Sequence, residues 1–370
     1  MTDAALYLDN NATTPLRPSA ATAMQSVMGL PANPSSVHQF GRAARLAVEA
    51  ARESVAALAG CRTADVVFTS GGTEANNIVL DQYDHVITSV IEHDSIRQVA
   101  GVSQIITVDR HGVIELDSVA AALAAIDDAA RPRTLISVMA ANNETGVLQP
   151  IDKIAAMAAE VNVAVHSDMV QIYGKRHLDF TQSQISYASI SAHKIGGPTG
   201  VGAVLVRPGS RLTSLLRGGG QEQGRRAGTE NLIGIAGFGA AAADAFADIG
   251  HYVTMAQWRD DFESQMIETL TGVQIFGVDA ARLGNTSCIA VAGKSAETMV
   301  MAFDIADVAV SAGAACSSGK VKASHVLQAM GAGGKAGEAI RISGGWKTGK
   351  QDFEKLADVF RRLYKQSAKE

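Results

Sequence analysis

The sequence predicts an α/β protein built on an open, mostly parallel β-sheet with helices on both faces, joined to a smaller α+β domain. Short apolar runs alternate with alanine-rich stretches of helical length up to about residue 206, and this alternation is typical of such a sheet. After about residue 253 the pattern becomes mixed. The chain has 370 residues, which is typical of one large and one smaller domain.

Seven apolar runs are expected to form the strands of the large sheet. They are short and rich in β-branched residues, as buried strands usually are. They cover residues 66–69, 85–90, 104–108, 135–138, 163–166, 185–190 and 202–206. Stretches between several of them predict helices at 41–59, 116–126 and 151–161. Because ligands of such sheets bind at the carboxyl ends of the strands, functional residues should follow these runs.

A long helix that begins near Thr229 is expected to connect the two domains. We expect residues 15–252 to form the large domain, and residues 1–14 with 253–370 to form the small one. Within the small domain, strands are expected near 288–291 and 308–310, and helices near 296–303, 324–330 and 352–364.

The composition is that of an ordinary soluble enzyme. The formal net charge of −5 offers no basic footprint for nucleic acid. No apolar run approaches the length of a membrane span, and the N-terminus lacks the pattern of a secretory signal. The three cysteines form no C-x-x-C pair, which argues against a disulfide framework or a self-contained zinc site and favours a reducing, cytoplasmic setting.

Lys194 follows an apolar stretch and precedes a Gly-Pro turn, so we expect it at the end of a strand. A lysine in a partly dry pocket loses its charge and becomes a nucleophilic amine, which can form a Schiff base with an aldehyde. Pyridoxal phosphate (PLP) is the commonest such aldehyde. Alone, this segment could be a solvated loop, but other features of the chain supply the remaining parts of a PLP site.

A glycine turn, Gly71-Gly72-Thr73, follows the strand that ends at residue 69 and is expected to open a helix. Glycines let backbone N–H groups approach a phosphate, and the helix dipole favours the anion. The alternative is an ordinary Thr N-cap after a turn. The sequence has no P-loop pattern and no clear G-x-G-x-x-G that opens a helix, so a nucleotide or dinucleotide site is not indicated.

Asp168 follows the strand at 163–166 and should lie at the ligand edge of the sheet. A carboxylate there can keep a pyridine nitrogen protonated and so make the ring an electron sink. Its alternative role is to cap the next helix. Gln171, three residues later, could donate to a phenolic oxygen of the ring.

His93 and Asn143 follow two further predicted strands. An imidazole can stack on an aromatic ring and move protons near neutral pH, although His93 could equally be a structural histidine. Asn143 could bond the ring or the substrate, or simply belong to a polar turn.

A glycine- and arginine-rich loop at 218–231 precedes the connecting helix. Its Thr229 could bring another hydroxyl to the phosphate, from the same or a neighbouring subunit. Arg341 lies on an apolar strand, where its fork suits either a substrate carboxylate or a structural salt bridge.

Cys316 is surrounded by small residues only, in the segment 311–319. An exposed and mobile thiol can react as a thiolate, whereas a cysteine that merely fills the core would lie among large apolar residues. Both interpretations of Cys316 stand at this level.

Taken together, the motifs resemble those of the NifS/IscS-type cysteine desulfurases, PLP-dependent enzymes with the type I fold of class V aminotransferases. The resemblance runs nearly end to end, and its motifs in this order are highly specific. The matching segments are 7–15, 33–38, 71–74, 92–93, 142–144, Gln171, 193–194, 228–231, Cys316 and 341–343. The long segment after Cys316 resembles the subgroup whose cysteine lies on a flexible loop.

The resemblance implies a role for each residue. Lys194 would carry PLP, Asp168 would pair with the pyridinium nitrogen, and His93 would stack on the ring. The phosphate would be held by Gly72, Thr73, Ser191, His193 and Thr229 from the other subunit of a homodimer. Gln171 and Asn143 would contact the ring oxygen. Arg341, with Asn143 nearby, would bind the substrate carboxylate, and Cys316 would form the persulfide.

The expected activity is the conversion of L-cysteine to L-alanine, with the sulfur left on Cys316 as a persulfide. Freed Lys194 would remove the Cα proton, and His93 would shuttle protons to and from the thiols. The acceptor would be an iron–sulfur scaffold or another protein, with nitrogenase maturation, general cluster assembly and tRNA thiolation all open. By resemblance alone, Cys316 could also ligate a nascent cluster transiently.

Three other functions are consistent with parts of the pattern. A selenocysteine lyase would act on selenocysteine but not on cysteine. A plain aminotransferase would not need Cys316 in its loop of small residues. A catalytically silent sulfur-relay partner would have lost cofactor residues, whereas Lys194, Asp168 and His93 are all present.

Overall fold

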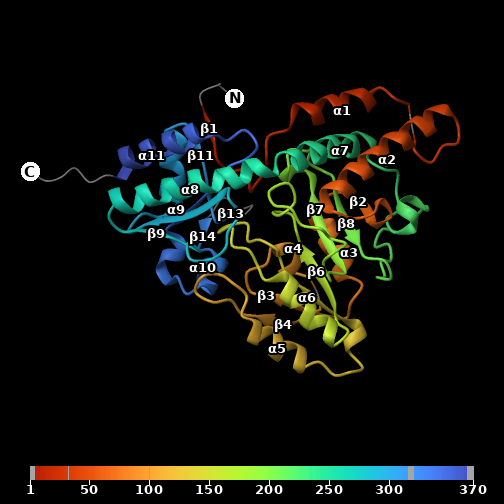
Figure 1. The fold of residues 1–370 in the computed structure, drawn as a ribbon, viewed down its shortest axis with the longest axis horizontal. Coiled ribbons are helices and arrows are strands. Elements are labelled where there is room, and N and C mark those ends of the chain that lie inside the picture. Colours follow the sequence, from red (N-terminus) through yellow and green to blue (C-terminus); the bar gives the residue numbers. More distant parts are fainter. Residues whose placement is uncertain (1–4, 32, 100, 316–320, 365–370) are drawn as a thin grey trace, which may run out of the picture.

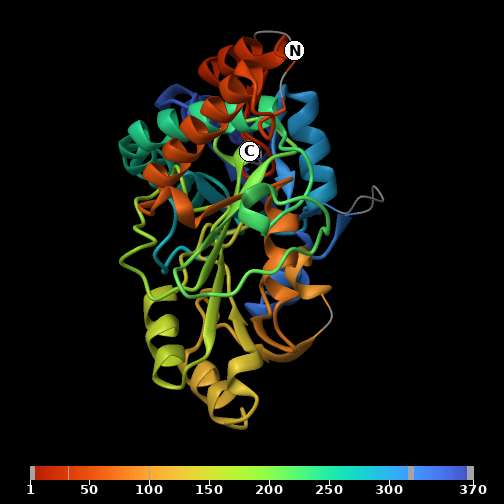
Figure 2. The same ribbon diagram turned by 90° about the vertical axis from the view of Figure 1, so that its right-hand side faces the viewer.

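The computed structural model describes residues 5–31, 33–99, 101–315 and 321–364. Two bodies lie side by side, a larger one around a central sheet and a smaller one that contains the chain's C-terminal part (Figure 1). Seen from the side, the large sheet lies between helices on its two faces (Figure 2).

The central sheet has seven strands in the order β2-β8-β7-β6-β5-β3-β4. Only the two pairs that involve β8 are antiparallel, which confirms the mostly parallel sheet expected from the sequence. The strands are β2 (Val66–Thr69), β3 (His85–Ser89), β4 (Val102–Ile106), β5 (Thr134–Ser137), β6 (Ala164–Asp168), β7 (Tyr187–Ser191) and β8 (Gly202–Val206).

The two faces of the sheet bury alternate residues of each strand, as the period of two requires. In β2, Phe68 joins the core under one set of helices, whereas Val67 packs against the other set. The first face is covered by α1 (Pro18–Met28), α2 (Gln39–Ala59), α5 (Leu116–Ala124), α6 (Ile151–Glu160) and α7 (Leu232–Ala247). The second is covered by α3 (Gly72–Leu80) and α4 (Asp94–Arg97).

The connection between the two bodies is a pair of helices, where the sequence predicted one long helix. α7 packs in the large core, and α8 (Ile249–Thr269) packs in the small core. The pair is bent by 61°, and no single helix of the described residues is long and apolar enough to cross a membrane. The bend lies at Asp248, whose carboxylate binds Arg17 of the N-terminal segment at 2.6 Å.

The small domain is built on an antiparallel sheet in the order β12-β15-β10-β9. Its strands are β9 (Val273–Ile275), β10 (Thr286–Val291), β12 (Ser311–Ala312) and β15 (Ala339–Ser343). The N-terminal strand β1 (Leu6–Tyr7) pairs with β11 (Val308–Ala309), and β13 (Ala314–Ala315) pairs with β14 (Val321–Lys322). The helices are α9 (Ala296–Ile305), α10 (His325–Ala329) and α11 (Lys350–Tyr364).

The N-terminal segment crosses from one core to the other. Leu8 packs in the small core and Ala20 in the large core. Val326 and Leu327 of α10 also pack in the large core. The segment 9–12 therefore passes over the carboxyl edge of the central sheet, where the candidate site lies.

Candidate active site

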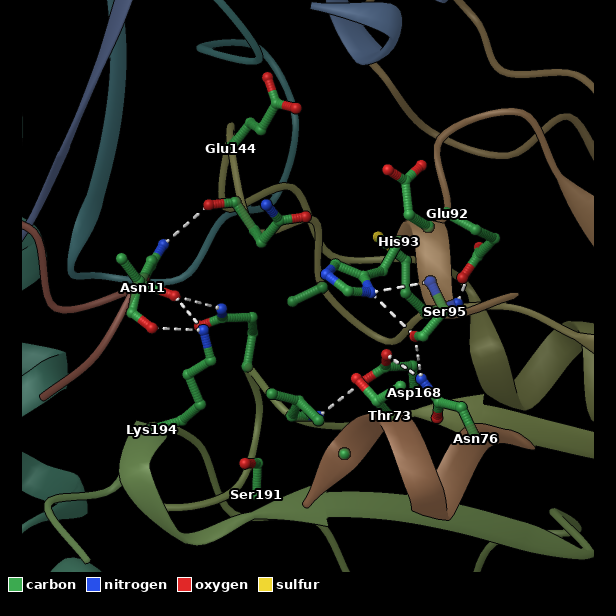
Figure 3. A pocket seen from close by; sticks show the side chains of 18 of the residues that line it. Asn11, Thr73, Asn76, Glu92, His93, Ser95, Glu144, Asp168, Ser191 and Lys194 are labelled. Carbon is green, nitrogen blue, oxygen red and sulfur yellow. Dashed lines mark hydrogen bonds between the residues drawn. The ribbon is translucent and has the colours of Figure 1, made fainter. Parts of the chain in front are cut away.

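A cavity of about 500 Å³ lies between the two domains at the carboxyl ends of the central strands. Figure 3 shows Lys194 and Asn11 on one side of it, and Asp168, Asn76, Ser95 and His93 on the other. Ten of the twelve site residues expected from the sequence line this cavity: Gly72, Thr73, His93, Asn143, Asp168, Gln171, Ser191, His193, Lys194 and Arg341.

Lys194 lies directly after β7, at the end of a short 3₁₀ turn. Its Nζ donates to the backbone carbonyls of Asn11 at 2.5 Å and Ala12 at 2.8 Å. Burial lowers the pKa of this amine to about 8, and the positive charge of Arg341 adds to the effect. A substantial fraction of the amine is therefore uncharged near neutral pH and able to act as a nucleophile or a base.

Asp168 ends β6 and presents its carboxylate to the cavity. Oδ2 accepts a hydrogen bond from Asn76 Nδ2 at 2.8 Å, and Oδ1 accepts one from the backbone N–H of Val170 at 3.0 Å. Both donors are neutral, and no cationic side chain among the described residues forms a salt bridge with this carboxylate. Such a carboxylate can pair with a cationic ring nitrogen of a ligand.

His93 caps the short helix α4 with its ring. Its Nδ1 accepts from the backbone N–H of Ser95 at 3.1 Å and lies 2.8 Å from Ser95 Oγ. Since Nδ1 is an acceptor, Nε2 carries the proton of the neutral ring. Asn76 Nδ2 also donates to Ser95 Oγ at 2.9 Å, so one chain of hydrogen bonds joins Asp168 to His93. His93 therefore caps α4 and also lines the cavity, so a structural role and a role toward a ligand are compatible.

The N-terminus of α3 forms one end of the cavity. Its N-cap residue, Gly71, gives no side-chain hydrogen bond to the first turn, which leaves backbone N–H groups to other partners. A Cβ on Gly72 would lie 3.0 Å from Val170 Cγ2, which is closer than an ordinary van der Waals contact, so a residue larger than glycine would crowd Val170 here. Ser191 and His193 line the same cavity, and burial lowers the pKa of His193 to about 4. This end can bind a phosphate through neutral donors.

Arg341 lies on β15 with its guanidinium at the cavity. Nη2 donates to Asp9 Oδ1 at 2.7 Å and Nη1 to the carbonyl of Asn143 at 3.3 Å, while the buried Nε has no partner among the described residues. The salt bridge that the sequence allowed as an alternative is thus present. The free Nε still leaves a donor for a ligand carboxylate.

Asn11, which belongs to a matching segment but had no predicted role, connects the two domains. Its carbonyl accepts from Lys194 and from Gln171 Nε2. Its Nδ2 donates to the Asn143 carbonyl at 3.1 Å and to Thr286 Oγ1 at 2.9 Å. A buried asparagine with every group used in this way fixes the N-terminal segment across the cavity.

Two buried acids at the cavity received no role from the sequence. Burial raises the pKa of Glu92 to about 8, although Ser89 Oγ donates to it at 2.5 Å. Burial also raises the pKa of Glu144, which accepts from Ser324 Oγ at 2.6 Å. Because Ser324 begins α10, Glu144 ties the turn after β5 to the small domain. In the sequence, Glu92 and Glu144 are marked only by their neighbours, His93 and Asn143, which belong to the matching motifs.

The remaining two expected residues are not at the cavity. Thr229 lines a separate cavity of about 160 Å³ together with Ser70 and Arg226. Cys316 lies outside the described residues. Of the other cysteines, burial raises the pKa of Cys61 to about 12 and that of Cys288 still further, so neither thiol ionises readily near neutral pH.

The residues of the main cavity fit PLP. An amine of lowered pKa, a carboxylate held only by neutral donors and a helix N-terminus without a side-chain cap are the groups that its aldehyde, ring nitrogen and phosphate need. Lys194, Asp168 and the turn at Gly72 would hold these three parts, with His93 against the ring.

Comparisons with known proteins agree with this geometry. The family profile described as aminotransferase class-V matches residues 6–356. The cysteine desulfurase IscS of Dictyoglomus turgidum is 35% identical over 97% of this chain and 94% of its own. The structure of a NifS-like protein from Rickettsia africae superposes with a TM-score of 0.89 and 33% identity, covering 97% of this chain and 99% of that one. The structure of SspA in complex with cysteine gives 0.76 and 31%, covering 91% and 98%.

Proposed function

The chain belongs to the class-V aminotransferase family and is a PLP-dependent cysteine desulfurase, and we propose that it passes the sulfur of L-cysteine to Cys316 and then to an acceptor protein. One observation carries this function. The Lys194 amine, with its lowered pKa, and the Asp168 carboxylate, which accepts hydrogen bonds from neutral donors, line the same cavity.

PLP, when bound, supplies an electron sink that makes the Cα proton of the substrate removable. Asp168 would hold a positive charge at the ring nitrogen and so strengthen that sink. Lys194, with its pKa near 8, is basic enough to take the Cα proton and acidic enough to return one. Arg341 orients the substrate by its carboxylate, through the donor edge that includes the unpartnered Nε.

Transfer of the sulfur needs only the substrate, the Cys316 thiolate and a proton. The Cys316 thiolate attacks the sulfur of cysteine, the C–S bond breaks, and the electron pair stays with the carbon that becomes the methyl group of alanine after it takes up a proton. The products are alanine and a Cys316 persulfide. His93, with Nε2–H free of its helix cap, is suited to carry protons between the thiols and the substrate.

We also propose that the enzyme is a homodimer in which Thr229 reaches the phosphate site of the other subunit. Thr229 lines a cavity of its own, apart from Gly72 and Thr73. Exposed apolar side chains near the N-terminus of α2, such as Phe40 and Leu46, suit a subunit interface. We infer an iron–sulfur scaffold as the acceptor because a relative carries the name IscS, and the reactive thiol suits a reducing compartment such as the cytoplasm.

Purified protein should be yellow and should form alanine from cysteine at the rate at which sulfide appears with a reductant. Lys194→Ala is expected to lose the visible absorbance. Cys316→Ser should keep it but release no sulfide. Normal desulfuration of cysteine by Cys316→Ser would show the persulfide role to be wrong, and activity with selenocysteine alone would replace the function with that of a selenocysteine lyase.

A further inference from the structure

Lys175 is a buried lysine to which the proposed reaction gives no role. Its side chain lies behind the main cavity, and the residue is only 4% exposed. It follows Gln171 by four residues in the turn after β6, and Gly174 between them has a φ of +79°. This left-handed conformation favours glycine, and a Cβ there would lie 2.9 Å from Ile195 Cγ2. The turn is thus built so that the chain reverses at Gly174 and the side chain of Lys175 reaches back to Gln171.

The Lys175 amine has two acceptors. Nζ donates to Gln171 Oε1 at 2.5 Å and to Asn11 Oδ1 at 3.1 Å. The charges that act on it, those of Lys194 and Arg341, are both positive, and burial lowers its pKa well below the usual 10.5. A neutral amine has two protons to donate, which matches the two acceptors, whereas an ammonium would have a third without one.

The contact with Lys175 fixes which way the Gln171 amide points. Because Oε1 accepts from Lys175, Nε2 faces the other way and donates to the Asn11 carbonyl at 3.1 Å. A reversed amide would bring its oxygen against that carbonyl and its nitrogen against a donor, which is unfavourable at both ends. The same carbonyl accepts from Lys194 at 2.5 Å, so the nitrogen of Gln171 is held beside the amine that carries the cofactor.

We propose that Lys175 is a positioning residue whose amine fixes the Gln171 amide with its nitrogen toward the cavity, where that nitrogen would donate to the ring oxygen of PLP. This inference rests on the proposed function, because it concerns the same cofactor. A donor to that oxygen stabilises its anionic form, so it should both tighten PLP binding and lower the pH at which the bound chromophore changes colour.

The test uses Lys175→Met, which keeps the length of the side chain and removes the donor. Apoprotein is titrated with PLP, and the visible absorbance of the loaded protein is followed against pH. We expect the dissociation constant of PLP to rise about tenfold and the midpoint of the absorbance change to move upward by about half a pH unit or more. Lys153→Met, the same change on the exposed face of α6, should leave both quantities at their wild-type values.

A double-mutant cycle separates positioning from a general structural effect. If Lys175 acts through Gln171, then Gln171→Leu should raise the midpoint as Lys175→Met does, and adding Lys175→Met to Gln171→Leu should change little more. A full additional effect in that background, or an unchanged midpoint in Lys175→Met, overturns the proposal. Thermal unfolding of each apoprotein checks that it folds. Should Lys175→Met not fold, Lys175→Gln, which retains a donor, must show the wild-type midpoint.

The outcome also distinguishes this inference from the function on which it depends. If wild-type protein shows no visible absorbance with PLP, the cofactor assignment fails. If wild-type protein binds PLP normally and Lys175→Met behaves identically, only the role of Lys175 fails.

Discussion

Asn76 donates an amide proton to the Asp168 carboxylate at 2.8 Å, across 92 residues of sequence. The second proton of the same amide goes to Ser95 Oγ at 2.9 Å, and Ser95 in turn holds the His93 ring. One side chain on α3 therefore sets both the carboxylate proposed to face the ring nitrogen of PLP and the imidazole expected to stack on the ring. This relation makes Asn76, which also lines the cavity, a sensitive position.

Replacing Asn76 by Asp should weaken PLP binding. The new carboxylate would lie where the amide donor now lies, and two carboxylates at this distance cannot both be ionised, so Asp168 would be partly neutralised. We expect the dissociation constant of PLP, measured by absorbance titration of apoprotein, to rise at least about tenfold.

The neighbouring Asn77→Asp provides the matched control for that change. Asn77 donates only to the backbone carbonyl of Ser95, at 2.9 Å, so its replacement removes a hydrogen bond but puts no charge beside Asp168. If Asn76→Asp binds PLP as tightly as Asn77→Asp does, the amide does not govern the charge of Asp168.

The pKa of Lys194, near 8, predicts the pH dependence of PLP attachment. A protonated amine cannot attack an aldehyde, so below pH 8 the second-order rate for apoprotein and PLP should fall by about tenfold per pH unit, and above pH 8 it should level off. The sign for stability is consistent with this. The folded pKa lies below the usual 10.5, so the unfolded chain binds more protons between these values, and this group makes the apoprotein more stable as pH rises from 8 to 10.5.

Stopped-flow absorbance between pH 6.5 and 9.5 measures that rate directly. Lys194→Ala supplies the baseline for PLP that binds without a covalent bond. A rate that continues to rise to the ordinary lysine pKa would show that neither burial nor Arg341 lowers the pKa of this amine in solution.

The parallel sheet and the strand-end positions of the site could be predicted from the sequence because both depend on local patterns. Lys194, Asp168 and His93 each follow a buried run, and parallel strands bring their carboxyl ends to one edge. The same logic does not reach Asn76 or Lys175. Each lies within a helix or turn, with no local feature that marks it, and its role comes from a partner brought close only by the fold.

The break between α7 and α8 shows a second limit of the sequence. The sequence predicts one long connecting helix from near Thr229, although its longest apolar run, 232–243, stops at Asp244. At the break, Asp248 is bound by Arg17, which is far away in the chain and also donates to the carbonyl of Ile195 next to Lys194. A tertiary ion pair of this kind leaves no local signal.

Arg341→Lys should raise the KM for cysteine by at least about tenfold while it changes kcat much less. Lysine keeps the positive charge but loses the planar fork, so it cannot hold Asp9, as Nη2 does, and at the same time bind a substrate carboxylate, as the unpartnered Nε is proposed to do. Steady-state alanine formation gives both constants. PLP affinity serves as the control, because the guanidinium makes its contacts with Asp9 and Asn143, and an equal loss in kcat would point to a role in the chemical step instead.

Gly202→Ala should damage the phosphate end of the site from outside it. Gly202 lies on β8, and a Cβ there would be 2.6 Å from the Ile190 carbonyl oxygen and 2.8 Å from the backbone of Gly71. Since these are backbone atoms, the turn that opens α3 must shift to admit the methyl group, and its N–H groups would no longer converge at one point. We expect PLP affinity to fall about tenfold or more.

Gly250→Ala, which adds the same methyl group to α8 where nothing lies within 4 Å, should retain wild-type affinity. Equal affinities for the two variants would mean that β8 does not hold the glycine turn in place, and that the phosphate end tolerates movement of α3.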